Sequence, residues 1–121
     1  MPAPTPRPQD LLPLTPAVFE ILLALADQER HGYGIMLEVE LRTGGATRLG
    51  PGTLYGSIKR MLASGLVEES GERPDPVLDD ERRRYYRLTR FGRRVAAAEA
   101  DRLERQVRQA REKRLLTGRL N

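Results

Sequence analysis

The sequence predicts a mainly α fold with a small β-hairpin, in which three helices precede the hairpin and a long helix follows it. Two observations predict this class. Apolar residues recur at helical spacing in four segments, and a loop rich in Gly, Pro and Asp separates two short segments that read as strands. The length of 121 residues suits one small domain.

The composition excludes several classes of protein. Hydrophobic residues make up 39% and charged residues 31% of the chain, as in a folded, soluble domain. We see no apolar run near 18 residues and no secretory signal, so we expect a cytoplasmic protein with no membrane partner. The absence of Cys excludes disulfides and thiolate chemistry, and one His, His31, cannot form a His-rich metal site. We therefore expect no metal, no cofactor and no enzymatic activity.

Charge is distributed unevenly along the chain. The net charge is +4, yet residues 14–50 carry three Arg against five acids, whereas residues 82–94 carry seven Arg and no acid. Such asymmetry favours an acidic partner such as nucleic acid. A solvated basic face is the plainer alternative.

The first elements show clear start signals. Residues 1–13 hold five of the nine prolines, which predicts a flexible Pro-rich extension. Thr15 is a good N-cap and Pro16 fits the first helical position. The apolar positions of this first helix are Val18, Ile21, Leu22 and Leu25.

A turn and a second helix come next. Residues 27–32 read as a turn, and a helix over residues 33–43 follows it. Two glycines, Gly44 and Gly45, end this helix.

A third helix begins at Pro51 or Gly52 and ends at Gly65. Its predicted buried stripe consists of Leu54, Ile58, Met61 and Leu62. Small or hydrogen-bonding residues occupy the other side, namely Thr53, Gly56, Ser57 and Arg60, flanked by Tyr55 and Lys59. No acid occurs in residues 50–67, which is unusual for an ordinary solvent-facing side.

The rest of the chain predicts a hairpin and a fourth helix. Residues 66–70 and 84–88 read as its two strands, and Tyr86 is expected in the core. Thr89 can cap a helix that reaches roughly to residue 116. This order is that of a winged helix-turn-helix plus a long C-terminal helix, with divisions at 1–13, 14–89 and 90–121. In that motif one helix lies in the DNA major groove, and the hairpin, which is called the wing, touches the flanking DNA backbone.

Three blocks resemble the PadR-type transcriptional regulators. The first block is His-Gly-Tyr-Gly-Ile at residues 31–35. The second is Gly-Thr-Leu-Tyr at residues 52–55, followed by residues 59–62 and 65–67. The third consists of residues 83–89 and 92–94. The resemblance covers roughly residues 14–94 and implies a dimeric winged-helix repressor whose final helix forms the dimer. Because one long helix follows the wing, the chain is similar to the short subgroup of that family. The chain departs from the family at Gly56, where Pro is frequent, and at the acidic wing-loop residues 79–81.

The candidate DNA-contacting residues fall in two groups. Those in or near the third helix are Arg48, Thr53, Tyr55, Ser57, Lys59 and Arg60, and those on the wing are Arg82, Arg83, Arg84 and Arg87. Arg60 can pair with guanine, hydroxyls can serve bases or phosphates, and wing arginines can neutralise phosphates. Two alternatives stay open. Tyr55 either bonds a phosphate through its hydroxyl or packs half-buried with the hydroxyl bonded to protein, and the acids at 79–81 pair with the wing arginines. His31 and Tyr33 are expected in turn hydrogen bonding and packing, not in catalysis.

The last helix carries a heptad-like seam. Its members, spaced by steps of 4, 3, 4 and 3, are Ala96, Ala100, Leu103, Val107 and Ala110. The seam predicts a homodimer, with packing on the same subunit as the alternative.

The functional prediction is a sequence-specific transcriptional regulator, a dimeric repressor that binds an inverted repeat in double-stranded DNA. The alternative is a winged-helix protein-protein interaction module that does not bind DNA. Some PadR-like proteins bind phenolic or drug-like compounds near the dimer interface, so a small-molecule effector of unknown identity stays open. Here Phe91 is the one aromatic residue of the last helix.

Overall fold

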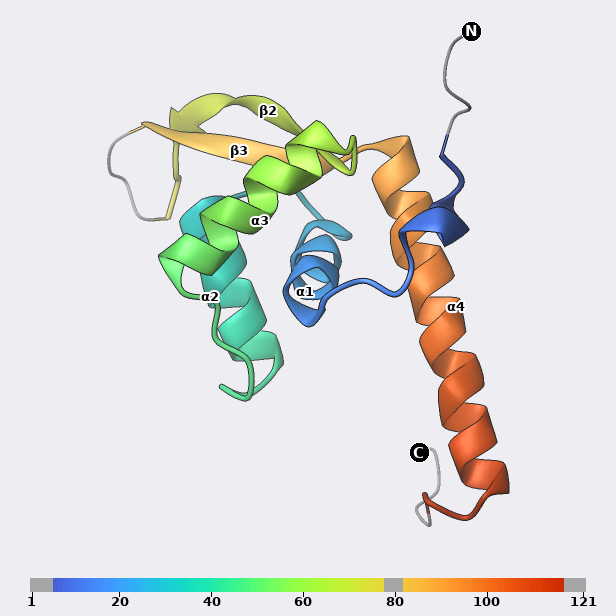
Figure 1. Ribbon diagram of the computed structural model, residues 1–121. Coiled ribbons are helices and arrows are strands. Elements are labelled where there is room, and N and C mark those ends of the chain that lie inside the picture. Colours follow the sequence, from blue (N-terminus) through green and yellow to red (C-terminus); the bar gives the residue numbers. More distant parts are fainter. Residues whose placement is uncertain (1–5, 78–81, 117–121) are drawn as a thin grey trace, which may run out of the picture.

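The computed structural model describes residues 6–77 and 82–116. Helices α1, α2 and α3 pack beneath a small sheet, and α4 runs away from the sheet along one side of the molecule (Figure 1). The elements in chain order are the 3₁₀ helix η1 (Pro8–Leu11), α1 (Pro16–Leu25), β1 (Arg30–His31), α2 (Gly32–Arg42), α3 (Pro51–Ala63), β2 (Val67–Pro74), β3 (Arg82–Leu88) and α4 (Arg90–Glu112). This architecture confirms the predicted fold class.

The starts of α1 and α2 follow from their capping residues. The Thr15 hydroxyl accepts a hydrogen bond from the Val18 amide, and Pro16 is the first residue of α1, as predicted. His31 caps α2, because its Nδ1 accepts from the Gly34 amide at 3.0 Å. This cap lets α2 begin at Gly32, one residue earlier than the sequence predicts.

Within the described residues the sheet has three strands in the order β1-β3-β2, all antiparallel. The sequence does not predict β1, because a two-residue strand is too short to show a period of two. The hairpin strands are longer than predicted and pair out to Pro74 and Arg82, with an irregularity between Glu69 and Gly71. Gly71 has a φ of +118°, which a residue with a Cβ rarely adopts.

Both tyrosines of β3 are buried, although the alternation of a strand sends them to opposite faces. Tyr86 belongs to the main core, as predicted. Tyr85 is 7% exposed on the other face, where the ring of His31 meets it edge-on and the Arg73 guanidinium stacks on it at 3.7 Å. Other side chains therefore pack against both faces of the hairpin.

The core joins all three helices of the body to the sheet and to the start of α4. Its fully buried large side chains include Ile21, Leu22, Ile35, Leu54, Met61 and Val95. Thr89 caps α4 by accepting from the Gly92 amide at 2.9 Å, as predicted, and the helix ends at Glu112, earlier than residue 116.

The N-terminal segment differs from the flexible extension that the prolines predict. Residues Pro8–Leu11 form η1, which packs against α4, and Pro8 is buried. The Leu14 amide donates to Oε2 of Glu99 at 2.8 Å, so the segment is tied to α4. Proline-rich sequence alone cannot reveal this contact, because its partner lies 85 residues away along the chain.

Glu99 is a buried acid at this contact, with a side chain only 2% exposed. Its Oε1 accepts from Nε of Arg102 at 2.5 Å. The Arg102 guanidinium and the Leu14 amide hold the pKa of Glu99 below its usual range, against the opposing effect of burial. The carboxylate therefore stays ionised where α4 meets the N-terminal segment.

Among the described residues, the structure contains no helix whose length and apolar character would let it span a bilayer.

Candidate nucleic-acid interface

The outer face of α3 is polar and basic. Thr53, Lys59 and Arg60 are exposed, as predicted for contacts with a partner. At 3.6 residues per turn, Gly56 lies between Lys59 and Arg60 on the outer arc. A Cβ at Gly56 would meet only Nη1 of Arg60 within 4 Å, at 3.6 Å. The middle of this face is therefore backbone that another molecule can approach closely.

Ser57 is a correction to the predicted interface. Its side chain is 1% exposed, and its Oγ accepts a long hydrogen bond of 3.4 Å from Nη2 of Arg60. Ser57 stands three residues after Leu54 and four before Met61, so it shares the buried stripe of α3. It can orient Arg60 from within but does not reach a ligand of the outer face.

Tyr55 packs against the first turn of α2. Its side chain is 49% exposed, and a Cβ at Gly32 would overlap the phenol ring. The absence of a side chain at Gly32 therefore leaves the space that the Tyr55 ring occupies. Tyr55 is therefore half-buried, and whether its hydroxyl bonds to protein or to a phosphate stays a prediction.

A small notch joins α3, the start of α2 and the wing. Its volume is about 140 Å³, and its lining includes Tyr33, Tyr55, Arg83, Arg84 and Tyr86. Burial raises the pKa of the Tyr86 hydroxyl, while the nearby Arg84 opposes that shift. The fold thus brings one member of the first predicted group, Tyr55, together with Arg83 and Arg84 of the wing, whereas the other candidate residues do not line the notch.

Arg84 and Arg87 form ion pairs with the neighbouring strand. Arg84 lies 3.5 Å from Glu69 and Arg87 lies 2.9 Å from Glu68, and both arginine side chains are more than half exposed. Exposed pairs of this kind contribute about 0–1 kcal/mol to stability. A phosphate can replace the glutamate at little cost, so the pairs do not disable the arginines. The acids at 79–81, expected as alternative partners, lie outside the described residues.

The other two wing arginines make different contacts. Nη2 of Arg82 donates to the Glu72 carbonyl. The Arg83 guanidinium lies over the Tyr33 ring, 5.5 Å from its centroid. Tyr33 is 38% exposed, and sequence analysis assigned it only to packing. Tyr33 is the second residue of α2, and the pairing of His31 with Tyr85 places it beside the wing, so no local sequence signal could have found this contact.

The remaining predicted residues are Arg48 and the seam of α4, and they differ in exposure. Arg48, in the loop between α2 and α3, has a 75% exposed side chain 3.4 Å from Glu40. Of the seam on α4, Ala96 packs on the core and Leu103 is partly buried, whereas Ala100 and Val107 are exposed. The own-subunit face of α4 is instead formed by Gly92, Val95 and Glu99.

Comparison with known proteins identifies the family. Residues 21–98 match the model of the transcriptional regulator PadR-like family. The chain is 39% identical over 85 residues to an uncharacterised 37.1 kDa protein in transposon TN4556 of Streptomyces fradiae. That match covers 70% of this chain but only 22% of the relative, so the chain spans about a fifth of the relative's length.

Two solved structures share the fold. A PadR family transcription regulator from Clostridium difficile R20291 superposes with a TM-score of 0.64 at 22% identity, over 83% of this chain and 98% of that chain. Bacillus subtilis PadR in complex with operator DNA gives a TM-score of 0.58 at 20% identity, over 75% and 48% of the two chains. The winged-helix fold and the match over more than half of the sequence together place this chain in the PadR-like family of transcriptional regulators.

Proposed function

We propose that this protein is a sequence-specific DNA-binding regulator that represses transcription as a homodimer. One observation carries the proposal: Tyr55, which flanks the acid-free outer face of α3, lines a notch together with Arg83 and Arg84 of the wing. A recognition helix and a basic wing on one surface are the two parts that a winged helix applies to DNA.

Each part of the surface has a distinct role in the proposed complex. Arg60 reads a guanine in the major groove through two hydrogen bonds, while Thr53 and Lys59 contact bases or phosphates. The wing arginines bind phosphates on the flanking backbone, which releases counterions from the DNA. Phosphate contacts set the register of the protein, and base contacts supply its sequence preference.

The proposed dimer uses α4. This helix extends beyond the body of the domain (Figure 1), and Ala100 and Val107 on its seam are exposed. An exposed apolar seam of heptad spacing favours pairing with a second helix. A two-fold dimer would place two α3 helices on an inverted repeat, with half-sites about one helical turn or a multiple apart.

DNA binding can be tested with a matched pair of arginine variants. Arg84→Ala and Arg105→Ala each remove a surface ion pair from a side chain of similar exposure, 56% and 58%, but Arg105 lies on α4. Binding to duplex DNA from upstream of the gene, and to a random duplex, is measured by fluorescence anisotropy between about 50 and 200 mM salt. We expect Arg84→Ala to flatten the salt slope by about one unit and Arg105→Ala to leave it unchanged.

The same titration distinguishes the alternative function. If the wild-type protein binds neither duplex at the lowest salt concentration, the proposed DNA binding is refuted and the alternative of a protein-protein interaction module is favoured. If it binds the upstream duplex no more tightly than the random one, the proposed operator does not lie in that region, and other promoters are tested in the same way.

A further inference from the structure

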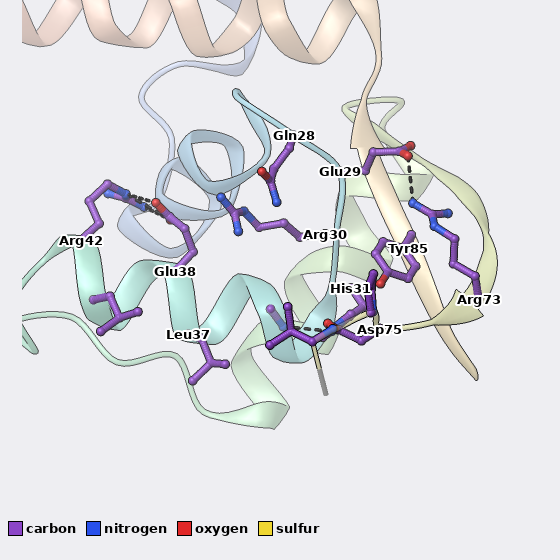
Figure 2. A pocket seen from close by; sticks show the side chains of 14 residues that line it. Gln28, Glu29, Arg30, His31, Leu37, Glu38, Arg42, Arg73, Asp75 and Tyr85 are labelled. Carbon is purple, nitrogen blue, oxygen red and sulfur yellow. Dashed lines mark hydrogen bonds and ion pairs between the residues drawn. The ribbon is translucent and has the colours of Figure 1, made fainter. Parts of the chain in front are cut away.

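A hollow outside the proposed DNA surface lies between α2 and the wing (Figure 2). Its walls come from the turn before β1, from α2 and from the segment 75–77 after β2, and Tyr85 of β3 also lines it. The volume is about 680 Å³, within the range of roughly 300–1,000 Å³ that is usual for small-molecule sites. None of the candidate DNA-contacting residues lines it.

Large apolar side chains on the lining face outward instead of into the core. Leu37 is 38% exposed and Leu41 is 81% exposed on α2, and Val77 on the opposite wall is 89% exposed. Tyr85 adds an aromatic surface. A ligand that removes these side chains from water is bound favourably, because burying apolar surface lowers the free energy.

The charged groups of the lining are already paired with other protein groups. Arg42 forms an ion pair with Glu38, and Arg73 forms one with Glu29, each with an N–O distance of 2.8 Å (Figure 2). Arg30 donates to the Ala24 carbonyl and to Asp27. Arg42 and Glu38 are 32% and 18% exposed, less than the wing pairs, so a charged ligand that displaced one of them would leave the other charge partly buried and unpaired. An uncharged ligand leaves the pairs intact.

A chain of hydrogen bonds connects the two walls. The Val77 amide donates to Oδ1 of Asp75 at 2.8 Å, and Oδ2 of Asp75 lies 2.5 Å from Nε2 of His31. Nδ1 of His31 accepts from the Gly34 amide, so Nε2 carries the proton that Asp75 receives as a hydrogen bond. The wing is thereby tied to the first turn of α2 at the edge of the hollow.

We propose that this hollow binds an uncharged, apolar small molecule, and that its occupancy is coupled to DNA binding through the wing. The ligand touches both α2 and the segment 75–77, so its affinity depends on how these two walls are spaced. DNA contacts at the wing depend on the same spacing. None of the candidate DNA-contacting residues lines the hollow, so ligand and DNA bind together, and His31, which lines both the hollow and the notch, lies between them. The two ligands therefore influence each other by linkage.

The site is tested on the full chain with N-phenyl-1-naphthylamine, an uncharged dye that fluoresces in apolar surroundings. Leu37→Asn removes apolar lining, and the matched control is Leu23→Asn, an equally exposed leucine (37%) of α1 outside the hollow. We expect the wild type and Leu23→Asn to bind the dye alike, and Leu37→Asn to bind it about tenfold more weakly.

Val77→Asn provides a second test from the opposite wall, on a residue outside any helix or strand. It should weaken dye binding as Leu37→Asn does. Absence of dye binding to the wild type, or equal binding by all four proteins, would overturn the site. A tighter affinity for the sulfonated, anionic relative of the dye would overturn its uncharged character.

Coupling is tested by measuring dye affinity with and without saturating duplex DNA. This step rests on the proposed function, whereas the dye contrast between Leu37→Asn and Leu23→Asn does not. A chain that fails to bind DNA would therefore refute the proposed function and leave the site standing. We expect DNA to change dye affinity by at least about fivefold, as is usual for coupled sites. An unchanged affinity on a DNA-bound protein would overturn the coupling.

Discussion

At the scale of one residue, a substitution at Gly56 is expected to change stability and DNA binding in opposite directions. The space around it accepts a methyl group, and alanine favours a helix over glycine by about 1 kcal/mol. We therefore expect Gly56→Ala to raise the melting temperature and yet to weaken DNA binding, because the methyl group keeps the α3 backbone away from the groove. Thermal unfolding and anisotropy titration measure the two effects. A variant that is more stable and binds equally well would show that Gly56 is not at the contact.

Glu99 makes stability depend on pH at the acidic end. Its pKa in the folded protein lies below the ordinary value of 4.5, so the carboxylate contributes its full stabilisation above that value. As the pH falls below about 4.5, the unfolded chain takes up the proton first, and the contribution is lost once the pH passes the lower folded pKa. Glu99→Gln should flatten this acid loss and destabilise the protein by about 1–3 kcal/mol at neutral pH.

Urea unfolding at a series of pH values measures the effect of Glu99. Glu104→Gln is the control, because Glu104 also pairs with an arginine of α4 but is 74% exposed. We expect its curve to follow that of the wild type. If both variants lose the same stability, the contribution comes from the general charge of α4 and not from the buried contact with Leu14.

At the scale of elements, the packing of α4 on the body depends on Gly92. A Cβ at this position would overlap the Leu66 carbonyl oxygen, which is backbone and cannot swing aside. We expect Gly92→Ala to destabilise the protein by about 1–3 kcal/mol or more, because α4 must move away from the backbone of Leu66, the residue before β2. Gly52→Ala has no atom within 4 Å of the new Cβ and serves as the control in thermal unfolding. Equal melting temperatures would contradict the close approach.

At the scale of the whole molecule, Leu103 tests the proposed dimer. It is the largest residue of the seam, and Leu103→Asp would place two charges near each other across a two-fold axis. We expect dissociation into folded monomers and a loss of operator affinity by a factor of about a hundred or more, since the two half-sites would no longer be joined. Gln109→Asp adds the same charge at an exposed position outside the seam. Sedimentation separates the outcomes, and a Leu103→Asp dimer of wild-type stability would exclude this seam.

The sequence determined the local features of the fold. Thr15, Pro16 and Thr89 start their helices where expected, because a cap or a first-turn proline acts within three or four residues. The period of the apolar residues predicted the buried faces of α1 and α3, and the three motif blocks predicted the family before any coordinates.

Only the tertiary structure decided features that depend on residues distant in the sequence. Ser57 is polar and still buried. The helical period places it beside Leu54, but the width of the buried face of α3 is set by the elements that pack on it. The pairing of β1 with β3, the contact of Leu14 with Glu99 and the hydrogen bond from His31 to Asp75 join residues 44 or more positions apart. Periodicity and capping are local signals and carry no information on such contacts, so the hollow beside α2 could be found only in the folded chain.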